Sequence, residues 1–348
     1  MAGSLLALVL GRKGYPVTIF DPHRNPPAMF RNEKLGTEQV TLLRDLGVLS
    51  CFEDACWPDG AYLEGARPGL TDCGAPHHEW LTSVRRAWPD IVQFAETQVT
   101  HMSTTSSRQT VTVSDGQTYD GRLVVLASGR MPQLRDAAGI KVRIVSPAHS
   151  VCLGFSVMTP QPIASQIHHV AYGKGIAYVS LFPMPGEVRI NVFSYRSMND
   201  SWTRRMSHDP LQGLAEVSPE AMQALEGAQV VRRCEARSTD LYRLEGHERD
   251  GLVVIGDAFH APCPASGTGM LRILHDIRVL SEGYLPHWLS AGSVNRNSIA
   301  TFYADRDKRK LDAKSLRSSK RGRESALNPS LQWSAYRALQ QAKRLIRL

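Results

Sequence analysis

The stretch DGLVVIGDAFHAPCPASGTGMLRILHDIRVL, residues 250–280, decides the fold of this chain. Its first part, Leu252–Ile255, is continuously apolar, as in a parallel strand that is buried on both faces. This run delivers Gly256 and Asp257 to its carboxyl end, which is where open α/β sheets bind their ligands. A loop rich in proline and glycine follows, and the pattern after it predicts a helix over about 270–280. The stretch therefore predicts a ligand site at a junction of strand, loop and helix.

The loop suits a flat ligand that carries negative charge at one edge. Asp257 can accept hydrogen bonds from polyol hydroxyls, and Pro264 stiffens the loop. Gly267 and Gly269 let backbone amides approach a ligand closely, because they have no side chain. The following helix directs its positive N-terminal end toward the same place. A flavin fits this pattern, since its reduced ring carries negative charge that oriented amides stabilise.

The N-terminal segment has the order helix, turn, strand and acid. Residues 3–13 are apolar on nearly all sides of a predicted helix, and Gly14 ends it. The short run Val17–Phe20 follows and stops at Asp21. Asp21 is about where a dinucleotide-binding fold places the carboxylate that accepts ribose hydroxyls. Gly3 lies at the helix start, where close packing or a close ligand requires the absence of a side chain.

Periodicity predicts the remaining elements along the chain. Up to residue 149 they are helices over 37–49, with Thr37 as the cap, and over 80–96, interrupted at Pro89, then a hairpin at Asp115-Gly116 and a buried strand over Leu123–Leu126. Beyond residue 149 they are an all-β region over 150–195, a helical region over 210–228, and a mostly helical end from about residue 298. Buried parallel-type strands on both sides of a β-rich middle predict a nucleotide-binding domain with an inserted sheet domain.

The segment 250–280 closely resembles the G-D-A-x-H…P…G-x-G motif of FAD-dependent aromatic hydroxylases. These are the single-component, group-A flavoprotein monooxygenases with a p-hydroxybenzoate hydroxylase-like fold. The resemblance implies FAD as the cofactor, with Asp257 at the ribityl chain. It also implies that Pro264, Gly267 and Gly269 lie along the flavin ring. His260 matches the motif too, and we interpret it as a structural loop histidine.

The resemblance extends over most of residues 3–310, in the family's order. Gly3 is similar to the family's position at the start of the first helix, and Asp21 to its ribose-binding acid. Arg31 resembles the arginine that contacts the flavin. Arg85, in preference to Arg86, resembles the helix arginine near the flavin diphosphate. Two further positions are implied: Gly256, at the start of the motif in the 250–280 segment, and Leu123–Arg135, which resembles the family's second motif, a strand followed by A-D-G…S…R.

The fold class implied by the resemblance is α/β, a Rossmann-like FAD-binding domain with an inserted β-sheet substrate domain and a helical C-terminal segment. The expected FAD-binding domain has two parts, 1–149 and 246–300. The β-rich substrate domain is expected over 150–245, and a basic helical segment over 301–348.

Three departures from the family pattern are visible. The chain begins just before the third glycine of G-x-G-x-x-G, so the first strand and the first two glycines of the fingerprint are missing, which predicts a misassigned start or a truncated copy. Ser128 replaces the Asp of A-D-G, a motif that the family links to both FAD and NADPH. NAD(P)H is therefore expected to donate electrons either directly or through a separate flavin reductase. Leu271 and Arg272 stand where the family usually has small or polar residues.

The implied function is FAD-dependent monooxygenation, in which a flavin peroxide hydroxylates or epoxidises an electron-rich, aromatic or polyketide-like small molecule with O2 as co-substrate. No catalytic side chain is predicted. Phe182, Phe193 and Tyr195 are either substrate-pocket residues or ordinary sheet core. Three alternatives stay open: a flavin-dependent halogenase, although no W-x-W-x-I-P motif is present, an isoprenoid reductase of the same fold, or a truncated, non-catalytic flavoprotein-like protein.

Composition excludes several other classes. Hydrophobic residues make up 42% and charged residues 21% of the 348 residues, which excludes wholesale disorder. No apolar run approaches the ~20 residues of a membrane span, so a cytoplasmic protein is expected.

Of the net charge of +8, the segment 306–323 contributes most, with nine Lys or Arg against two Asp. We interpret this segment as a solvated helix face and expect no nucleic-acid partner. Cys and His show no metal-ligand spacing, and no metal is expected.

Overall fold

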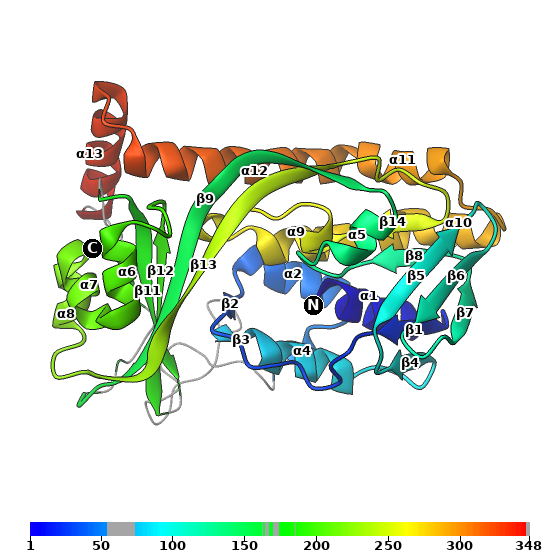
Figure 1. Cartoon of the computed structure of the whole chain (residues 1–348), viewed down its shortest axis with the longest axis horizontal. Coiled ribbons are helices and arrows are strands. Elements are labelled where there is room, and N and C mark those ends of the chain that lie inside the picture. The colour runs from blue at the N-terminus through cyan, green and yellow to red at the C-terminus, as the bar shows by residue number, and fades with distance from the viewer. Residues whose placement is uncertain (54–73, 162, 164–166, 170–173, 185, 346–348) are drawn as a thin grey trace.

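Two pairs of parallel strands lie at the centre of the first lobe of the structure (Figure 1). In one pair β1 (Val17–Phe20) lies beside β4 (Val92–Ala95), and in the other β14 (Leu252–Val254) lies beside β8 (Val124–Leu126). The side chains of β14 are at most 1% exposed, which confirms the buried parallel strand that the sequence predicts. The computed structural model describes all residues except 54–73, 162, 164–166, 170–173, 185 and 346–348.

The first helix, α1 (Ala2–Arg12), is buried on nearly all sides, as its apolar sequence predicts. It packs against β1, α4 (His77–Arg86) and α9 (Gly269–Arg278). Close packing depends on Gly11, because a Cβ atom there would lie 2.4 Å from Val92 Cγ2. The helix is therefore held at the centre of the first lobe, with its N-terminal end directed at the loop before α9.

Shorter elements complete the first lobe. They are β2 (Asn32–Lys34), α2 (Thr37–Asp45), α3 (Ser50–Glu53), β3 (Gly74–Pro76), β5 (Val99–Thr104), β6 (Gln109–Val113), β7 (Thr118–Gly121) and α5 (Gln133–Ala137). β5, β6 and β7 form an antiparallel sheet, and β2 pairs with β3. The hairpin predicted at Asp115-Gly116 is confirmed, with Gly116 in the left-handed region at φ 86°.

Two local expectations are wrong. The N-cap of α2 is Gly36 and not Thr37, because the backbone N–H of Gly36 donates to Gln39 Oε1 at 2.8 Å. The helix predicted over 80–96 ends at Arg86, and β4 follows Pro89. Apolar residues keep helical spacing through this break, so the pattern continues although the helix does not.

The second lobe is built on a five-stranded antiparallel sheet in the order β10-β11-β12-β9-β13. The strands are β9 (Lys141–Met158), β10 (Ile167–His169), β11 (Ile176–Met184), β12 (Glu187–Ser194) and β13 (Gln229–Glu245). The all-β region predicted over 150–195 is present. The sequence did not reveal that β9 begins at Lys141 or that β13 exists. Both strands run from the first lobe into the second (Figure 1), so β9 crosses the predicted domain boundary after residue 149, and the domain limits stay a prediction.

Alternation along these strands gives the sheet two different faces. One face is apolar and packs against α6 (Ser201–His208), α7 (Pro210–Val217) and α8 (Pro219–Gln223). Trp202 lies at the centre of this packing, where it is 1% exposed and its Nε1 donates to the Gly213 carbonyl at 2.7 Å. The other face looks toward the first lobe and carries polar and aromatic side chains.

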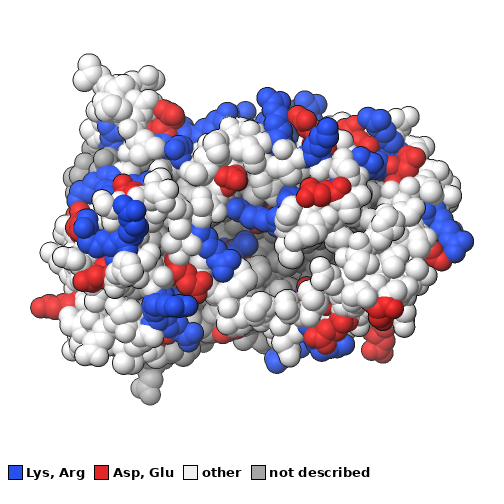
Figure 2. Space-filling view, viewed as in Figure 1, with Lys and Arg blue, Asp and Glu red and all other residues white. Residues whose placement is uncertain are grey.

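The C-terminal part is helical, as predicted. After α9 come a π-helical turn (Val279–Tyr284), α10 (Leu285–Ser290), α11 (Arg296–Ala304), α12 (Arg306–Leu327) and α13 (Leu331–Leu345). α12 extends along both lobes (Figure 1), and Lys and Arg side chains gather along the same edge of the surface (Figure 2). Most basic residues of α12 are exposed, whereas Lys308 is 1% exposed. Within the described residues no helix is long and apolar enough to cross a bilayer.

We expect Trp202→Ala to destabilise the second lobe by about 3–5 kcal/mol, because the substitution leaves a large cavity in its core. Trp202→Phe keeps most of the ring volume and loses the hydrogen bond to Gly213, so we expect a loss nearer ~1 kcal/mol. Urea unfolding followed by far-UV circular dichroism measures both. Equal losses for the two variants would contradict the packing role.

Candidate functional site

A large cavity of about 2540 Å³ runs along the first lobe and under the sheet of the second. Its wall includes the start of α1, the end of β1, the turn after β8, and the loop before α9. It exceeds the ~300–1,000 Å³ typical of a pocket for one small ligand. The cavity therefore has room for a dinucleotide and a substrate together.

The loop between β14 and α9 forms one side of this cavity. Gly256 and Gly267 are in the left-handed region, at φ 62° and 63°, as only glycine adopts without strain. A Cβ atom on Gly256 would lie 2.9 Å from the Ala2 Cβ, so α1 packs directly on the loop. Thr268 precedes α9, but its hydroxyl bonds to Ser315 Oγ at 2.6 Å and does not cap the helix. Among the residues that the structure describes, no side chain caps the first N–H groups of α9.

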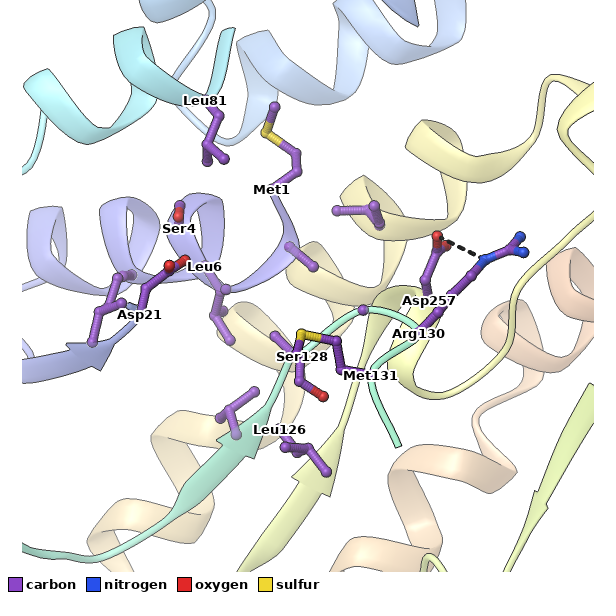
Figure 3. Close-up of a pocket in the computed structure, with 18 of the residues that line it drawn as sticks. Met1, Ser4, Leu6, Asp21, Leu81, Leu126, Ser128, Arg130, Met131 and Asp257 are labelled. Carbon is purple, nitrogen blue, oxygen red and sulfur yellow. Dashed lines mark ion pairs between the residues drawn. The ribbon is translucent and has the colours of Figure 1, made fainter. Parts of the chain in front are cut away.

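Asp257 faces the cavity between two cations. Its Oδ2 lies 4.0 Å from Arg31 Nη1 and 3.9 Å from Arg130 Nε, and Figure 3 marks the second pair. Behind it the Tyr242 hydroxyl donates to the Asp257 carbonyl, and Arg135 Nη1 donates to Tyr242 at 3.0 Å. Neither cation makes a close bond with the carboxylate. Asp257 can therefore still accept hydrogen bonds from a ligand.

A second cluster lies on the other side of the cavity (Figure 3). Arg85 Nη2 is 2.6 Å from Asp21 Oδ2, and Arg85 Nε donates to Ser4 Oγ at 3.4 Å. The Arg85 guanidinium also lies over the Phe94 ring, 5.3 Å from its centroid. Gly3 lets α1 approach the strand end, since a Cβ there would be 3.2 Å from Ala127 Cβ. This cluster joins a carboxylate, a cation and a helix N-terminus.

The predicted cofactor-binding residues thus fall into two groups around one cavity. Eight of them line it: Gly3, Asp21, Arg31, Arg85, Asp257, Pro264, Gly267 and Gly269. Gly256 lies beneath the loop and contacts α1 instead. The sequence did not single out Glu33, and it gave Arg130 and Arg135 only as part of the motif over Leu123–Arg135 and His77 only as a possible metal ligand. The assignment of the predicted cofactor-binding residues to FAD stays a prediction.

The face of the sheet that looks toward the first lobe closes the cavity. Tyr178, Phe182 and Phe193 line it, and the rings of Tyr178 and Phe193 lie 4.6 Å apart. Tyr195 does not line it, so of the two alternatives given for this residue the structure agrees with a place in the core. The chain leaves the sheet at Ser194, and Tyr195 packs instead with Leu241 and Cys263 in a small cluster beside α12.

A buried ion network supports the loop from behind. Arg272, the unexpected residue after the glycines, is 1% exposed, and its Nε is 2.8 Å from Asp312 Oδ1. Its Nη1 donates to the His260 carbonyl at 2.7 Å. Lys308 Nζ lies 2.8 Å from Asp276 Oδ1 and 3.2 Å from Asp312 Oδ2. Burial, with repulsion from Arg272, lowers the pKa of His260 to about 3, which fits a neutral structural residue.

We expect acidification to destabilise the fold through His260. An unfolded imidazole titrates near pH 6.5, so below that pH the unfolded state binds a proton that the folded state refuses. Stability should therefore fall between about pH 6.5 and pH 3, by up to ~1.4 kcal/mol per pH unit for this group. His260→Gln should reduce the difference in free energy of unfolding between pH 7 and pH 5. His101→Gln, at an exposed position, should not. The same difference in wild type and His260→Gln would refute this.

The fold is that of solved flavin-dependent monooxygenases. The family model of squalene epoxidase matches residues 121–316, more than half of the chain. The chain belongs to the squalene epoxidase family. This confirms the resemblance to FAD-dependent monooxygenases that the 250–280 segment indicates.

Solved structures share the fold at low sequence identity. p-Nitrophenol 4-monooxygenase PnpA from Pseudomonas putida DLL-E4 has a TM-score of 0.70 and 12% identity, covering 97% of this chain and 90% of that chain. HpxO from Klebsiella pneumoniae, solved with FAD and uric acid, has a TM-score of 0.69 and 18% identity, covering 99% and 92%. These likenesses show the fold, a Rossmann-like domain combined with a β-sheet domain.

A relative in sequence is ubiquinone hydroxylase UbiL of Rhodospirillum rubrum, which is 32% identical over 188 residues. The match covers 49% of this chain and 39% of the hydroxylase. The matched part is therefore well under half of that relative's length.

Proposed function

We propose that this chain is an FAD-dependent monooxygenase that hydroxylates or epoxidises an electron-rich small molecule with O2. The observation that carries the proposal is the uncapped N-terminus of α9, which follows Gly267 and faces the cavity beside Asp257. Membership of the squalene epoxidase family supports oxygen insertion over the halogenase and reductase alternatives. The two residue groups around the cavity suit the two ends of a dinucleotide.

The residues fit FAD by their chemistry. The backbone amides of α9 and the cations Arg31 and Arg130 favour a ligand edge that carries negative charge. Asp257 is a carboxylate acceptor suited to ribityl hydroxyls, and Asp21 is one suited to ribose hydroxyls, with Arg85 able to neutralise a phosphate. Gly267 and Gly269 leave the ring face open, since a Cβ atom on either would meet nothing closer than 4.0 Å.

Bound FAD, once reduced, would supply the activation of O2 for oxygen transfer. The chain's own contribution is to bind, orient and exclude water. The α9 amides would stabilise negative charge at the edge of a bound flavin, and the sheet residues Tyr178 and Phe193 would pack against an aromatic substrate. Burial raises the pKa of Tyr178, so its hydroxyl stays neutral there. No side chain is needed as a nucleophile.

The proposed substrate is aromatic or polyketide-like. The aromatic wall of the cavity supports this class, and the matched relative is named a ubiquinone hydroxylase. We propose NAD(P)H as the electron source, either directly or through a flavin reductase. Ser128 bears on the choice between these two routes, because it stands where the family has the Asp of a motif linked to NADPH. Its buried Oγ lines the cavity and has no hydrogen-bond partner among the described residues. A cytoplasmic location stays a prediction.

We expect Asp257→Asn to weaken FAD binding by about 10- to 100-fold, the effect of losing a charged hydrogen-bond acceptor. Quenching of flavin fluorescence on titration with the purified protein measures the affinity. Asp45→Asn is the matched control, because Asp45 is exposed at the end of α2 and outside the cavity. Unchanged affinity in Asp257→Asn would refute the assignment of this residue.

Product analysis with the loaded protein separates the remaining alternatives. Oxygen from 18O2 in the product, formed in the absence of halide, is the expected result with phenols, quinone precursors or polyenes. A product that requires chloride or bromide would indicate a halogenase, and a saturated product without oxygen would indicate a reductase. A folded chain that takes up no FAD would support the non-catalytic alternative. Adding a flavin reductase tests whether NADPH oxidation depends on it.

A further inference from the structure

The Glu33 carboxylate joins two side chains that come from different parts of the chain. Its Oε1 lies 2.7 Å from Arg31 Nε and 3.0 Å from His77 Nδ1. Burial alone would raise the pKa of Glu33, but the Arg31 guanidinium and the hydrogen bond from His77 lower it to about 2. Burial also lowers the pKa of His77, so a neutral ring donates its Nδ1 proton. Glu33 is therefore an ionised acceptor that holds both donors.

The backbone fixes this arrangement. β2 pairs with β3 in the register Glu33 opposite Ala75, and the His77 N–H donates to the Arg31 carbonyl at 3.0 Å. His77 is thus brought beside Arg31 by strand pairing and by the start of α4. The side chains of Glu33 and His77 are largely buried, with 12% of Glu33 and 14% of His77 exposed. Water does not compete strongly for these bonds.

The residue before Arg31 is anchored on the sheet of the second lobe. Phe30 packs against Gly154, where a Cβ atom would lie 2.4 Å from Phe30 Cδ2. Arg189 Nε donates to the Phe30 carbonyl at 3.2 Å. Arg31 is therefore held on one side through Phe30 and on the other through Glu33.

The orientation of the Arg31 guanidinium follows from these contacts. Nε is engaged by Glu33, whereas Nη1 reaches to 4.0 Å from Asp257 Oδ2. Nη2 lies 4.0 Å from the position of a Cβ atom on Gly269. A free arginine would lose much of its side-chain conformational entropy on being fixed there. A pre-oriented one has already lost it before a ligand binds.

We propose that Glu33 and His77 are positioning residues, which hold the Arg31 guanidinium toward the loop at Asp257 and Gly269 so that it binds the flavin part of FAD. The proposal rests on the proposed function, since it takes FAD to be the ligand of this loop. The competing interpretation is purely structural, in which the Glu33 contacts only join β2 to the start of α4.

A double-mutant cycle on FAD affinity distinguishes the two roles. The variants are Glu33→Gln, Arg31→Met and the double variant, each titrated with FAD and each unfolded with urea in the absence of FAD. We expect Glu33→Gln to weaken FAD binding about 10-fold and Arg31→Met to weaken it at least as much. In the Arg31→Met background, Glu33→Gln should have no further effect on affinity. A structural role predicts the same loss of affinity in both backgrounds.

Glu216→Gln is the matched control, because Glu216 forms an ion pair of the same 2.7 Å length with Arg205 in the second lobe. It should leave the FAD affinity unchanged. If Glu33→Gln does not fold, His77→Gln takes its place in the cycle. A loss of threefold or more that disappears with Arg31→Met supports the proposal. Unchanged affinity in the Glu33 or His77 variant, or additive losses with Arg31→Met, overturns it. A folded wild-type chain that binds no FAD overturns the proposed function itself.

Discussion

The buried pairing of Arg272 with Asp312 is the interaction on which the candidate site depends. The same guanidinium donates to the His260 carbonyl, so a side chain of α9 fixes the loop that precedes its own helix. Lys308 completes the network from α12, and breaking one partner would leave an uncompensated charge in the interior. Because the loop is held from behind in this way, its amides and the Asp257 carboxylate are left facing the cavity. The buried ion network on one side of the loop therefore supports the groups that face the cavity on its other side.

Much of this site could be predicted from the sequence because its signals are local. A continuous apolar strand, a glycine that adopts φ 63° and a helix start all occur within residues 252–270. α1 and β1 were predictable for the same reason, since each shows its periodicity within a dozen residues. Of Arg85 and Arg86, Arg85 lines the cavity, and its place near the flavin diphosphate stays a prediction.

The rest could not be predicted because it depends on contacts between distant residues. The first half of β9 is mostly exposed or half-buried on both faces, so residues 141–149 lack the alternation that marks a strand. Glu33 and His77 are 44 positions apart, and nothing in either segment indicates the other. The place of Tyr195 in the core could not be predicted, because it depends on the chain leaving the sheet after Ser194. Arg272 departs from the family pattern, and its role depends on Asp312, 40 positions away.

The long ribbon of β9 and β13 has a mechanical consequence. Lobes connected by a single flexible linker can rotate about one or two backbone bonds, but here two hydrogen-bonded strands pass together from one lobe to the other. The pairing is interrupted where Ser150 opposite Thr239 gives way to Ser146 opposite Leu241, and Ala148 adopts φ 40° there, with its N–H donating to Asp240 at 2.6 Å. A movement of one lobe relative to the other would therefore bend this double-stranded ribbon, and the bulge is one of the places where its pairing is interrupted. The width of the cavity between the loop before α9 and the sheet of the second lobe would then depend on how stiff the ribbon of β9 and β13 is.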